Sequence, residues 1–352
     1  MIFFYLLFFL SILLAFGGNR KTKVRMAWLP FLIMLLLCGL RGDKVGTDTE
    51  GYIYHFMYGV SERYELLFQF IIETCHFLGM TAHQFIFVTA LLIFVPLYIF
   101  VSKRSVNPCF SALIYITFSV TFFGMTFNGV RQAIAMAFSL YSIYYLDKKI
   151  LVKGIIFFVI AVLFHYSCLV LAPFLILFYS VHSIGKKLLY SVLIGSFCFG
   201  LSFGQNAYFL QFFQYFELIS DSAVASNYLQ YADESNVASR GIISVLGIML
   251  PFMMYSIFLY DSKNKSSLAY TFIVTGAVLS NIFISIHYMY RMAAYFILPI
   301  LYVLPETQER TKGYKYYALC VLNAIMLLWY FYSLLKAGPE SANGIFPYST
   351  FL

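Results

Sequence analysis

The stretch Arg41-Gly-Asp-Lys-Val-Gly-Thr-Asp-Thr-Glu-Gly-Tyr52 separates an apolar run, residues 26–40, from a tyrosine-rich segment, residues 52–64. These twelve residues hold five charges, in a chain that is 62% hydrophobic and only 11% charged. Three glycines let the backbone turn tightly and approach a ligand closely. Because ionisable groups at a membrane boundary are costly, charges of both signs here predict a functional loop. The alternative is an ordinary solvated loop, since loops are normally polar.

The rest of the chain has the composition of a polytopic membrane protein. Its mean hydropathy is +0.82, and apolar runs of 15–22 residues recur from end to end. A membrane helix needs roughly 20 apolar residues, with about 17 as the usual lower limit, so we expect several short or tilted helices. The 40 Phe and 30 Tyr suit lipid-facing surfaces and interfacial belts. The composition predicts an all-α membrane fold.

Charge and cysteine usage exclude other classes. The net charge of +8 is spread over short loops and forms no basic stripe, so no nucleic-acid partner is predicted. The cysteines lie singly without a CxxC pair, which supports neither a metal site nor a disulfide framework. We interpret them as small buried hydrophobic residues. The six are Cys38, Cys75, Cys109, Cys168, Cys198 and Cys320.

The apolar runs predict about twelve transmembrane helices within a single domain, residues 1–352. The first has no basic residue before it and four after it, so we expect an uncleaved anchor with both chain termini outside. The predicted spans are 2–16, 26–40, 83–101, 108–127, 129–146, 150–164, 166–181, 188–204, 241–260, 268–286, 288–304 and 316–335.

Two outer segments interrupt these spans. Residues 41–82 hold the charged loop and an amphipathic stretch, residues 65–79, in which Glu65, Glu73 and His76 interrupt an apolar stripe. This stretch predicts an interfacial or re-entrant helix. Residues 205–239 form the longest polar interruption, and loops of this length tend to be lids or binding loops.

The distribution of basic residues agrees with this threading. Sixteen of the 23 Lys and Arg fall in predicted inner loops, and each inner loop holds at least two, as the positive-inside rule requires. The remaining seven are outside: Arg41, Lys44, Arg63, Arg131, Arg240, Arg291 and Lys336.

Polar residues that are unusual for a membrane protein fall at the outer ends of predicted helices. Residues 128, 131 and 132 lie on one face of a first helical turn, and residues 287 and 291 are spaced i, i+4. Arginine suits phosphate because its planar fork makes bidentate bonds and keeps its charge when buried. The set predicted to ring one outer cavity is Arg41, Asp48, Asn128, Arg131, Gln132, His165, His287 and Arg291.

Each of these residues has a structural alternative. Arg131 and Arg291 would equally suit snorkelling to lipid headgroups. His165 would equally suit a neutral histidine bonded to a backbone carbonyl, and Asn128 a helix cap. No Walker A, GxGxxG or GxSxG motif is present, and His76 and His83 lack a third metal ligand at a usable spacing. Any chemistry is therefore predicted to need neither nucleotide nor metal.

The order of these motifs resembles the EpsG family of Wzy-type polysaccharide polymerases over nearly the full length of the chain. The motifs are Arg41…Val45-Gly46-Thr47-Asp48-Thr49…Tyr52, Asn128-x-x-Arg131-Gln132-x-Ile134-Ala135, Phe164-His165-x-Ser167, Tyr290-Arg291 and Pro347-Tyr348. Gly42-Asp43-Lys44 fills the variable part of the first motif.

The resemblance implies an O-antigen or capsule (exopolysaccharide) polymerase in the bacterial inner membrane. Such enzymes resemble all-helical GT-C glycosyltransferases with a periplasm-facing active site. They take oligosaccharide repeat units on undecaprenyl diphosphate and move the growing chain onto the non-reducing end of an incoming unit. Undecaprenyl diphosphate is the leaving group. Membrane lipids surround the protein, and the resemblance allows a chain-length regulator and a flippase as pathway partners.

This reading assigns roles to the predicted site. The arginines at 41, 131 and 291 would hold the diphosphate, because a dianionic leaving group needs positive charge. His165 is the first candidate for the base that accepts the hydroxyl proton, and Asp48 is the second. Neither cofactor nor metal is predicted. Asn128, Gln132, His287 and Tyr52 complete the predicted substrate-binding set.

Two other classes compete with this reading. A flippase for lipid-linked sugars should place charges along a path through both leaflets, whereas here they gather at one face. A membrane acyltransferase would need an acyl-donor path from the cytoplasm, and the short inner loops offer no site for one. The clustering favours the polymerase.

Overall fold

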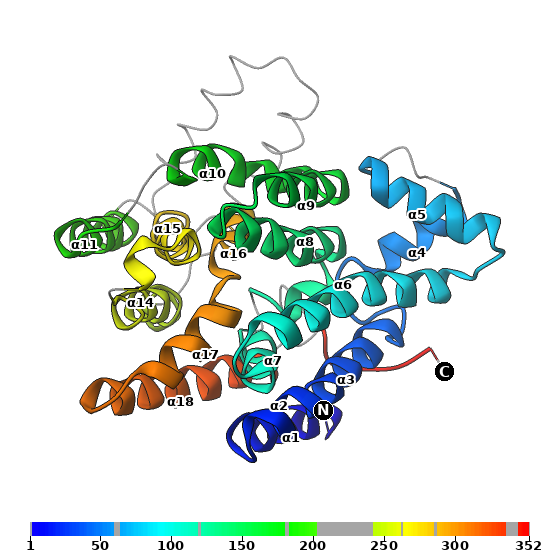
Figure 1. Cartoon of the computed structure of the whole chain (residues 1–352). Helices are drawn as coiled ribbons and strands as arrows, with labels where there is room; N and C mark the ends of the chain where they lie inside the picture. The colour runs from blue at the N-terminus through cyan, green and yellow to red at the C-terminus, as the bar shows by residue number, and fades with distance from the viewer. Residues whose placement is uncertain are drawn as a thin grey trace. The chain divides into compact units, whose positions relative to one another are not determined.

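The computed structural model describes residues 2–59, 64–118, 121–179, 183–202, 242–261, 263–284, 287–335 and 344–351. Most of these residues lie in helices and none lies in a strand, which confirms the predicted all-α class (Figure 1). Packing divides the chain into two compact units, Met1–Ala172 with Leu298–Leu352 and Pro173–Ile297. The predicted single functional domain is not tested by this division, and the loop at 205–239 lies outside the described residues.

The first unit holds most of the helices and the Glu65, Arg131 and His165 side chains described below. They are α1 (Ile2–Phe16), α2 (Arg20–Met26), α3 (Trp28–Gly39), α4 (Thr49–Met57), α5 (Leu66–Phe77), α6 (Ala82–Arg104), α7 (Pro108–Thr117), the 3-10 helix η1 (Gly124–Phe127), α8 (Val130–Asp147), α9 (Leu151–Phe164), the 3-10 helix η2 (Tyr166–Val170), α17 (Ile300–Arg310) and α18 (Tyr314–Leu335).

In the second unit, α15 is the central helix and packs against its three neighbours. Asn281 of α15 is buried and donates from Nδ2 to the Ser196 hydroxyl of α11 at 3.0 Å. Gly200 lets the two helices approach, because a Cβ there would lie 2.2 Å from the Asn281 carbonyl oxygen. The helices are α11 (Lys186–Ser202), α14 (Ile242–Phe258), η4 (Asn264–Ser266), α15 (Leu268–Ile282) and α16 (His287–Ile297), with α10 (Leu171–Tyr179) running into this unit from the first.

Three helical stretches among the described residues are long and apolar enough to cross a membrane: Arg20–Gly39, Ala82–Arg104 and Tyr314–Ser333. Several other apolar helices are shorter, as expected from run lengths near the lower limit for a span. These helices are those of a membrane protein. Twelve spans and the GT-C likeness stay predictions.

Two predicted spans are broken in the structure. Residues 108–127 were expected to form one helix, but α7 ends at Thr117, and the described residues 121–127 hold the 3-10 helix η1 in place of an α-helix. Residues 288–304 were expected to form another, but α16 ends at Ile297 and α17 begins after Pro299. Pro299 explains the second break, because proline lacks an N–H and disfavours helical backbone at the residue before it. The first run holds no proline after Pro108.

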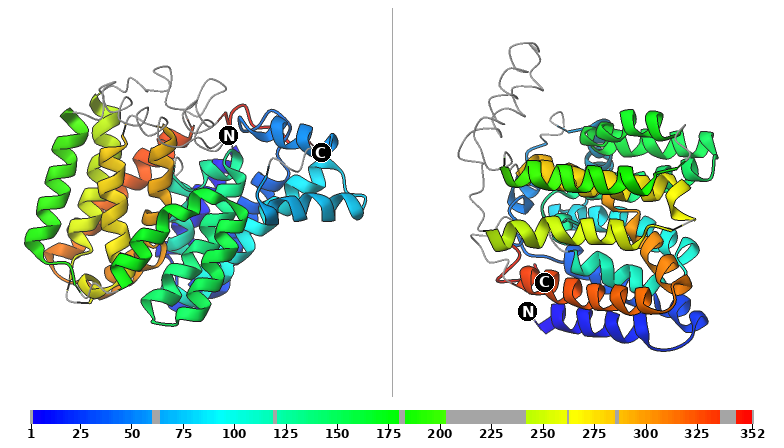
Figure 2. Two further views of the ribbon diagram at one scale, coloured as in Figure 1. Left: turned by 90° about the horizontal axis from the view of Figure 1, so that it is seen from above. Right: turned by 90° about the vertical axis from the view of Figure 1, so that its left-hand side faces the viewer.

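The hairpin of α8 and α9 positions the site, and its helices run side by side (Figure 1 and Figure 2). Gly154 of α9 lies against Leu146 of α8 so closely that a Cβ would sit 2.5 Å from the leucine Cγ. The Ser142 hydroxyl donates to the Gly154 carbonyl at 2.8 Å. Phe138 and Phe164 stack with ring centroids 5.6 Å apart. The hairpin thus fixes where α8 begins and α9 ends.

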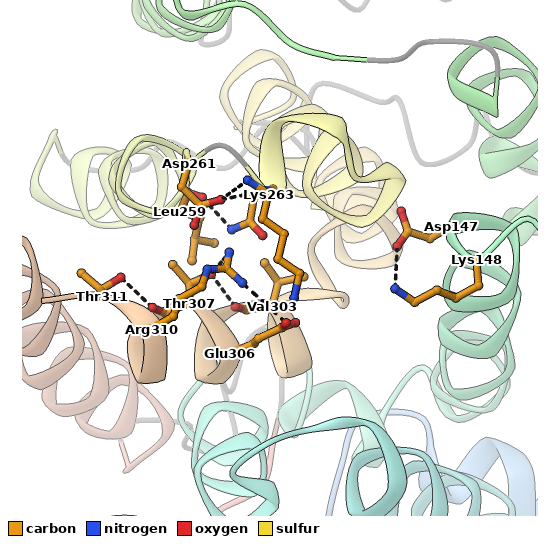
Figure 3. A network of polar contacts seen from close by, with 11 residues as sticks. Asp147, Lys148, Leu259, Asp261, Lys263, Val303, Glu306, Thr307, Arg310 and Thr311 are labelled. Carbon is orange, nitrogen blue, oxygen red and sulfur yellow. Dashed lines mark hydrogen bonds and ion pairs between the residues drawn. The ribbon is translucent and has the colours of Figure 1, made fainter.

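The opposite ends of several helices carry the polar side chains shown in Figure 3. In α17, Arg310 pairs with Glu306 at 3.5 Å, and its Nη2 donates to the Thr307 hydroxyl at 3.3 Å. At the end of α8, Lys148 lies 3.9 Å from the Asp147 carboxylate. These residues occupy the predicted inner loops, where basic residues gather.

Candidate active site

His165 stands where α9 stops. Its backbone is extended, with φ −160° and ψ 117°, so the helix ends there and η2 begins at the next residue. The apolar sequence before it favours a helix, and the extended backbone at His165 turns the chain away from the axis of α9. The side chain is 20% exposed.

Glu65 connects His165 to Arg131. It precedes α5, but its side chain does not cap that helix. One carboxylate oxygen, Oε1, lies 2.6 Å from His165 Nδ1 and accepts from the Tyr166 backbone N–H at 3.3 Å. The other oxygen, Oε2, accepts from Arg131 Nη1 at 2.5 Å. Residues far apart in sequence therefore form one Glu–His–Arg cluster, defined here as Glu65, Arg131 and His165.

The cluster keeps Glu65 ionised. Burial of the carboxyl opposes ionisation, but the hydrogen bond from His165 and the positive charge of Arg131 outweigh it, so the pKa of Glu65 falls to about 2. An ionised carboxylate only accepts hydrogen bonds, so His165 Nδ1 carries a proton. In the neutral imidazole, Nε2 is then an unprotonated acceptor. This is the tautomer that a general base requires.

Aromatic rings hold Arg131 from a second side. Its guanidinium lies over the Tyr64 ring, 4.8 Å from the centroid, and the Tyr52 side chain forms a hydrogen bond with it. Tyr52 and Tyr64 stack with centroids 6.1 Å apart. The Tyr64 hydroxyl is also hydrogen-bonded to His55 Nδ1. A predicted site residue, Tyr52, thus contacts the cluster.

Arg41 has a different environment from Arg131. It is only 2% exposed, donates from Nε to the Thr49 hydroxyl at 3.0 Å, and donates from Nη1 to the Cys38 carbonyl at 2.7 Å. Its Nη2 is buried and has no hydrogen-bond partner in the part of the chain that the structure describes. In this structure Arg41 joins the end of α3 to the start of α4.

Asn128 and Asp48 lie at the loop that Arg41 supports. Asn128 Oδ1 accepts from the Thr47 backbone N–H at 2.7 Å and from the Thr47 hydroxyl at 3.2 Å. Asp48 is exposed, and its Oδ1 accepts from the same hydroxyl at 3.2 Å. Asn128 therefore holds the loop against the start of α8.

The remaining predicted residues are placed as follows. Gln132 is buried on the first turn of α8, next to Arg131. Arg291 lies on α16 in the second unit and is partly exposed. His287 begins α16, but its side chain lies outside the described residues. Whether the three arginines share one cavity stays a prediction.

Sequence reasoning missed Glu65, which was considered only as an interruption of an apolar stripe. Its partners lie 66 and 100 residues further along the chain. An acidic residue before an apolar helix is also what the helix dipole favours, so no local signal separates the two roles. Among the described residues, no group of three His, Cys, Asp or Glu is arranged to hold a metal ion.

The fold and cluster define a membrane protein with an ionised, buried carboxylate between a histidine and an arginine. The chain belongs to the EpsG family, whose model matches residues 24–350. This is a family of Wzy-like polymerases. No curated protein and no solved structure matches the chain.

Proposed function

We propose that this protein polymerises oligosaccharide repeat units carried on undecaprenyl diphosphate, at the periplasmic face of the bacterial inner membrane. The growing chain moves from its lipid diphosphate to the non-reducing end of a new lipid-linked unit, building O antigen or capsule. The observation that carries the proposal is the His165–Glu65 pair beside Arg131 in a chain of this family.

The pair suits proton transfer from a sugar hydroxyl. As the hydroxyl oxygen attacks the anomeric carbon, His165 Nε2 accepts its proton, and the ionised Glu65 stabilises the imidazolium that forms. A new glycosidic C–O bond forms while the anomeric C–O bond to the diphosphate breaks. The bonding electrons leave with the diphosphate. No metal is required for this proton transfer.

Arg131 suits the developing negative charge of the leaving group. Its Nη1 is used by Glu65, while its Nε is buried with no hydrogen-bond partner among the described residues. The side chain is 26% exposed, so part of the guanidinium is within reach of a substrate oxygen. A charged donor fixed before the reaction stabilises a leaving diphosphate without reorganisation cost. Arg291 remains the second candidate for this contact.

The test is the surface polysaccharide of a deletion strain. A polymerase predicts product carrying a single repeat unit, restored to a full ladder by the wild-type gene. Complete loss of surface sugar with lipid-linked units held in the cytoplasm would instead identify a flippase. With purified protein and lipid-linked repeats, we expect a ladder of products and an equal release of lipid diphosphate. That ladder should be unchanged by EDTA.

A further inference from the structure

The segment 344–351, called the strap here, lies antiparallel to residues 40–46. Arg41 and Thr350 form an isolated β-bridge. Backbone hydrogen bonds join the two segments along their length: Phe351 N to Leu40 O at 3.3 Å, Gly42 N to Ser349 O at 2.8 Å and Gly46 N to Gly344 O at 2.9 Å. The end of the chain is therefore paired with the charged loop that follows α3.

Side chains anchor the strap independently of these backbone bonds. Ile345 is fully buried and Phe346 is 6% exposed. Phe346 and Tyr348 both pack edge-on against Phe4 of α1, with centroids 5.0 and 5.5 Å away. The Tyr348 hydroxyl donates to the Leu37 carbonyl at 2.8 Å. A buried aromatic anchor together with a paired backbone indicates a fixed element rather than a loose terminus.

The opposite side of the loop contacts the start of α8. Thr47 makes its two hydrogen bonds to Asn128 there. Gly46 has φ +88°, and a Cβ at that residue would lie 2.5 Å from the Phe127 carbonyl oxygen, so only glycine fits. The loop is thus a layer between the strap on one side and residues 127–128 on the other.

This layer leads directly to the cluster. The loop ends at Asp48, α4 begins at Thr49, and Tyr52 on its first turn is buried against Arg131. From the other side, Asn128 stands three residues before Arg131, between η1 and α8. Any shift of the loop therefore moves both Tyr52, which packs against Arg131, and the beginning of α8.

We propose that the strap positions the catalytic cluster, by clamping the 40–48 loop between itself and the start of α8. The strap residues are positioning residues and not catalytic ones, since they act through Tyr52 and Arg131. The proposal rests on the proposed function for its activity readout. Its structural part is independent of that function.

The test uses a cross-link that the geometry allows. A Cβ on Gly42 would lie 3.5 Å from the Ser349 Cβ, and Cβ atoms in disulfides are about 3.5–4.5 Å apart. We expect the Gly42→Cys/Ser349→Cys protein to form a disulfide on oxidation and to keep its turnover. Gly42→Cys and Ser349→Cys alone are the matched controls for oxidation of the natural cysteines.

Loosening the strap should then reveal its role. Phe346→Ala removes the anchor, and we expect kcat to fall about tenfold or more per folded protein, with KM for the lipid-linked acceptor changed less than twofold. Oxidised Gly42→Cys/Ser349→Cys in the Phe346→Ala background should recover most of kcat, and reduction should remove the recovery. A merely destabilising substitution would lower the amount of folded protein without this redox-dependent rescue.

Two results would overturn the proposal. One is that both the Phe346→Ala variant and a chain truncated after residue 343 keep the kcat of the wild-type protein. The other is a disulfide-locked wild-type background that is inactive until reduced, which would make the strap a lid. Hydrogen exchange of residues 42–57 provides a readout without activity: protection should drop in Phe346→Ala and return on cross-linking. If the wild-type protein makes no polymer, the hydrogen-exchange result still shows whether the strap holds residues 42–57 in place.

Discussion

Glu65 accepts hydrogen bonds from both His165 and Arg131, so each of these residues depends on the carboxylate for its orientation. For His165, the bond selects the tautomer in which Nδ1 carries the proton and Nε2 carries none. For Arg131, it uses one Nη donor and holds the guanidinium plane over Tyr64. A histidine and an arginine predicted separately from their membrane side are thus joined in one hydrogen-bonded cluster.

Replacing His165 by glutamine tests the base. Glutamine keeps a hydrogen bond to Glu65 but cannot accept and hold a proton. Because general-base help is typically worth about 10²–10⁴-fold in rate, we expect His165→Gln to lower single-turnover polymerisation by that factor at a normal protein level. His83→Gln is the matched control, since its Nε2 also faces a carboxylate, Asp43, at 3.3 Å. Normal turnover in His165→Gln with loss in Asp48→Asn would move the base to Asp48.

Lysine substitutions separate the two arginines of the first unit. Arg131→Lys keeps the charge but cannot hold Glu65 and a substrate oxygen in one planar fork, so we expect kcat to drop at least tenfold. Arg41→Lys loses bonds that join α3 to α4, and we expect a lower thermal unfolding midpoint with a smaller kcat loss than in Arg131→Lys, because the strap and Asn128 still hold the loop. The measurement is kcat beside unfolding in detergent for each variant. Equal kcat losses would show that Arg41 also serves the reaction.

The depressed pKa of Glu65 predicts a pH-dependent stability. Its ordinary pKa is near 4.5 and its folded value is about 2, so its ionised form stabilises the fold fully above about pH 4.5. This contribution disappears as pH falls toward 2. We expect Glu65→Gln to unfold at a lower temperature than wild type at pH 7, with the gap closing between pH 4.5 and 2. Glu50→Gln, exposed on α4, should leave the midpoint unchanged; a gap that does not vary with pH would contradict the ion pair.

Residue type and membrane side were enough to single out His165 and Arg131 as candidates, whose roles stay predictions, and the family motif added Tyr52. They did not suffice for Glu65. A carboxylate whose partners are 66 and 100 residues away is recognisable only when the fold brings them together. The burial of Arg41 was equally out of reach, since its acceptors are a backbone carbonyl and a threonine hydroxyl, which carry no charge pattern.

At the scale of elements, the hairpin of α8 and α9 decides the spacing of Arg131 and His165, which stand at its open end. Gly154 allows this close packing. We expect Gly154→Ala to force a shift against Leu146 and to cost about 1–3 kcal/mol through overpacking, with a loss of kcat. Gly195→Ala on α11 is the control, because nothing lies within 4 Å of its Cβ position. The measurements are the polymerisation rate and the thermal unfolding midpoint of both variants, and equal values in the two would contradict the role of Gly154.

A partial rescue would locate the effect of Gly154→Ala. Leu146→Ala removes the atoms that the new Cβ would meet, so the double variant should recover part of the kcat that Gly154→Ala loses. If the double variant is worse than either single one, the hairpin does not transmit packing to the site in this way.

Hydropathy predicted helices better than it predicted their interruptions. α1 and α9 match their apolar runs within a residue at each end, because nothing in those runs favours a turn. In contrast, residues 118–127 belong to an apolar run that predicted a span, yet Gly124 begins a 3-10 helix and Gly129 is the N-cap of the next helix. The proline at 299 indicates a break in the helix, but the hydropathy of residues 288–304 alone predicts a continuous one.

At the scale of the whole molecule, the orientation in the membrane decides whether the cluster can meet periplasmic substrate. The topology is predicted from charge, with 16 of 23 basic residues assigned inside. Single cysteines placed at exposed positions test it with a membrane-impermeant thiol reagent in spheroplasts. We expect labelling of Lys44→Cys, in the loop, and of Glu50→Cys, on α4. We expect no labelling of Lys21→Cys, Lys148→Cys or Lys263→Cys until the cells are opened. All five residues are exposed in the structure.

The natural cysteines set the background for this labelling. Four of the six are buried, Cys320 is partly buried, and Cys198 is exposed on α11, so Cys198→Ser is the parent for the series. Labelling of Lys148→Cys together with Glu50→Cys would mean that α8 does not separate the two sides of the membrane. If only positions 21, 148 and 263 were labelled, the protein would have the opposite orientation in the membrane. The cluster would then face the cytoplasm, whereas the proposed donor and acceptor meet at the periplasmic face. This outcome would contradict the proposed function.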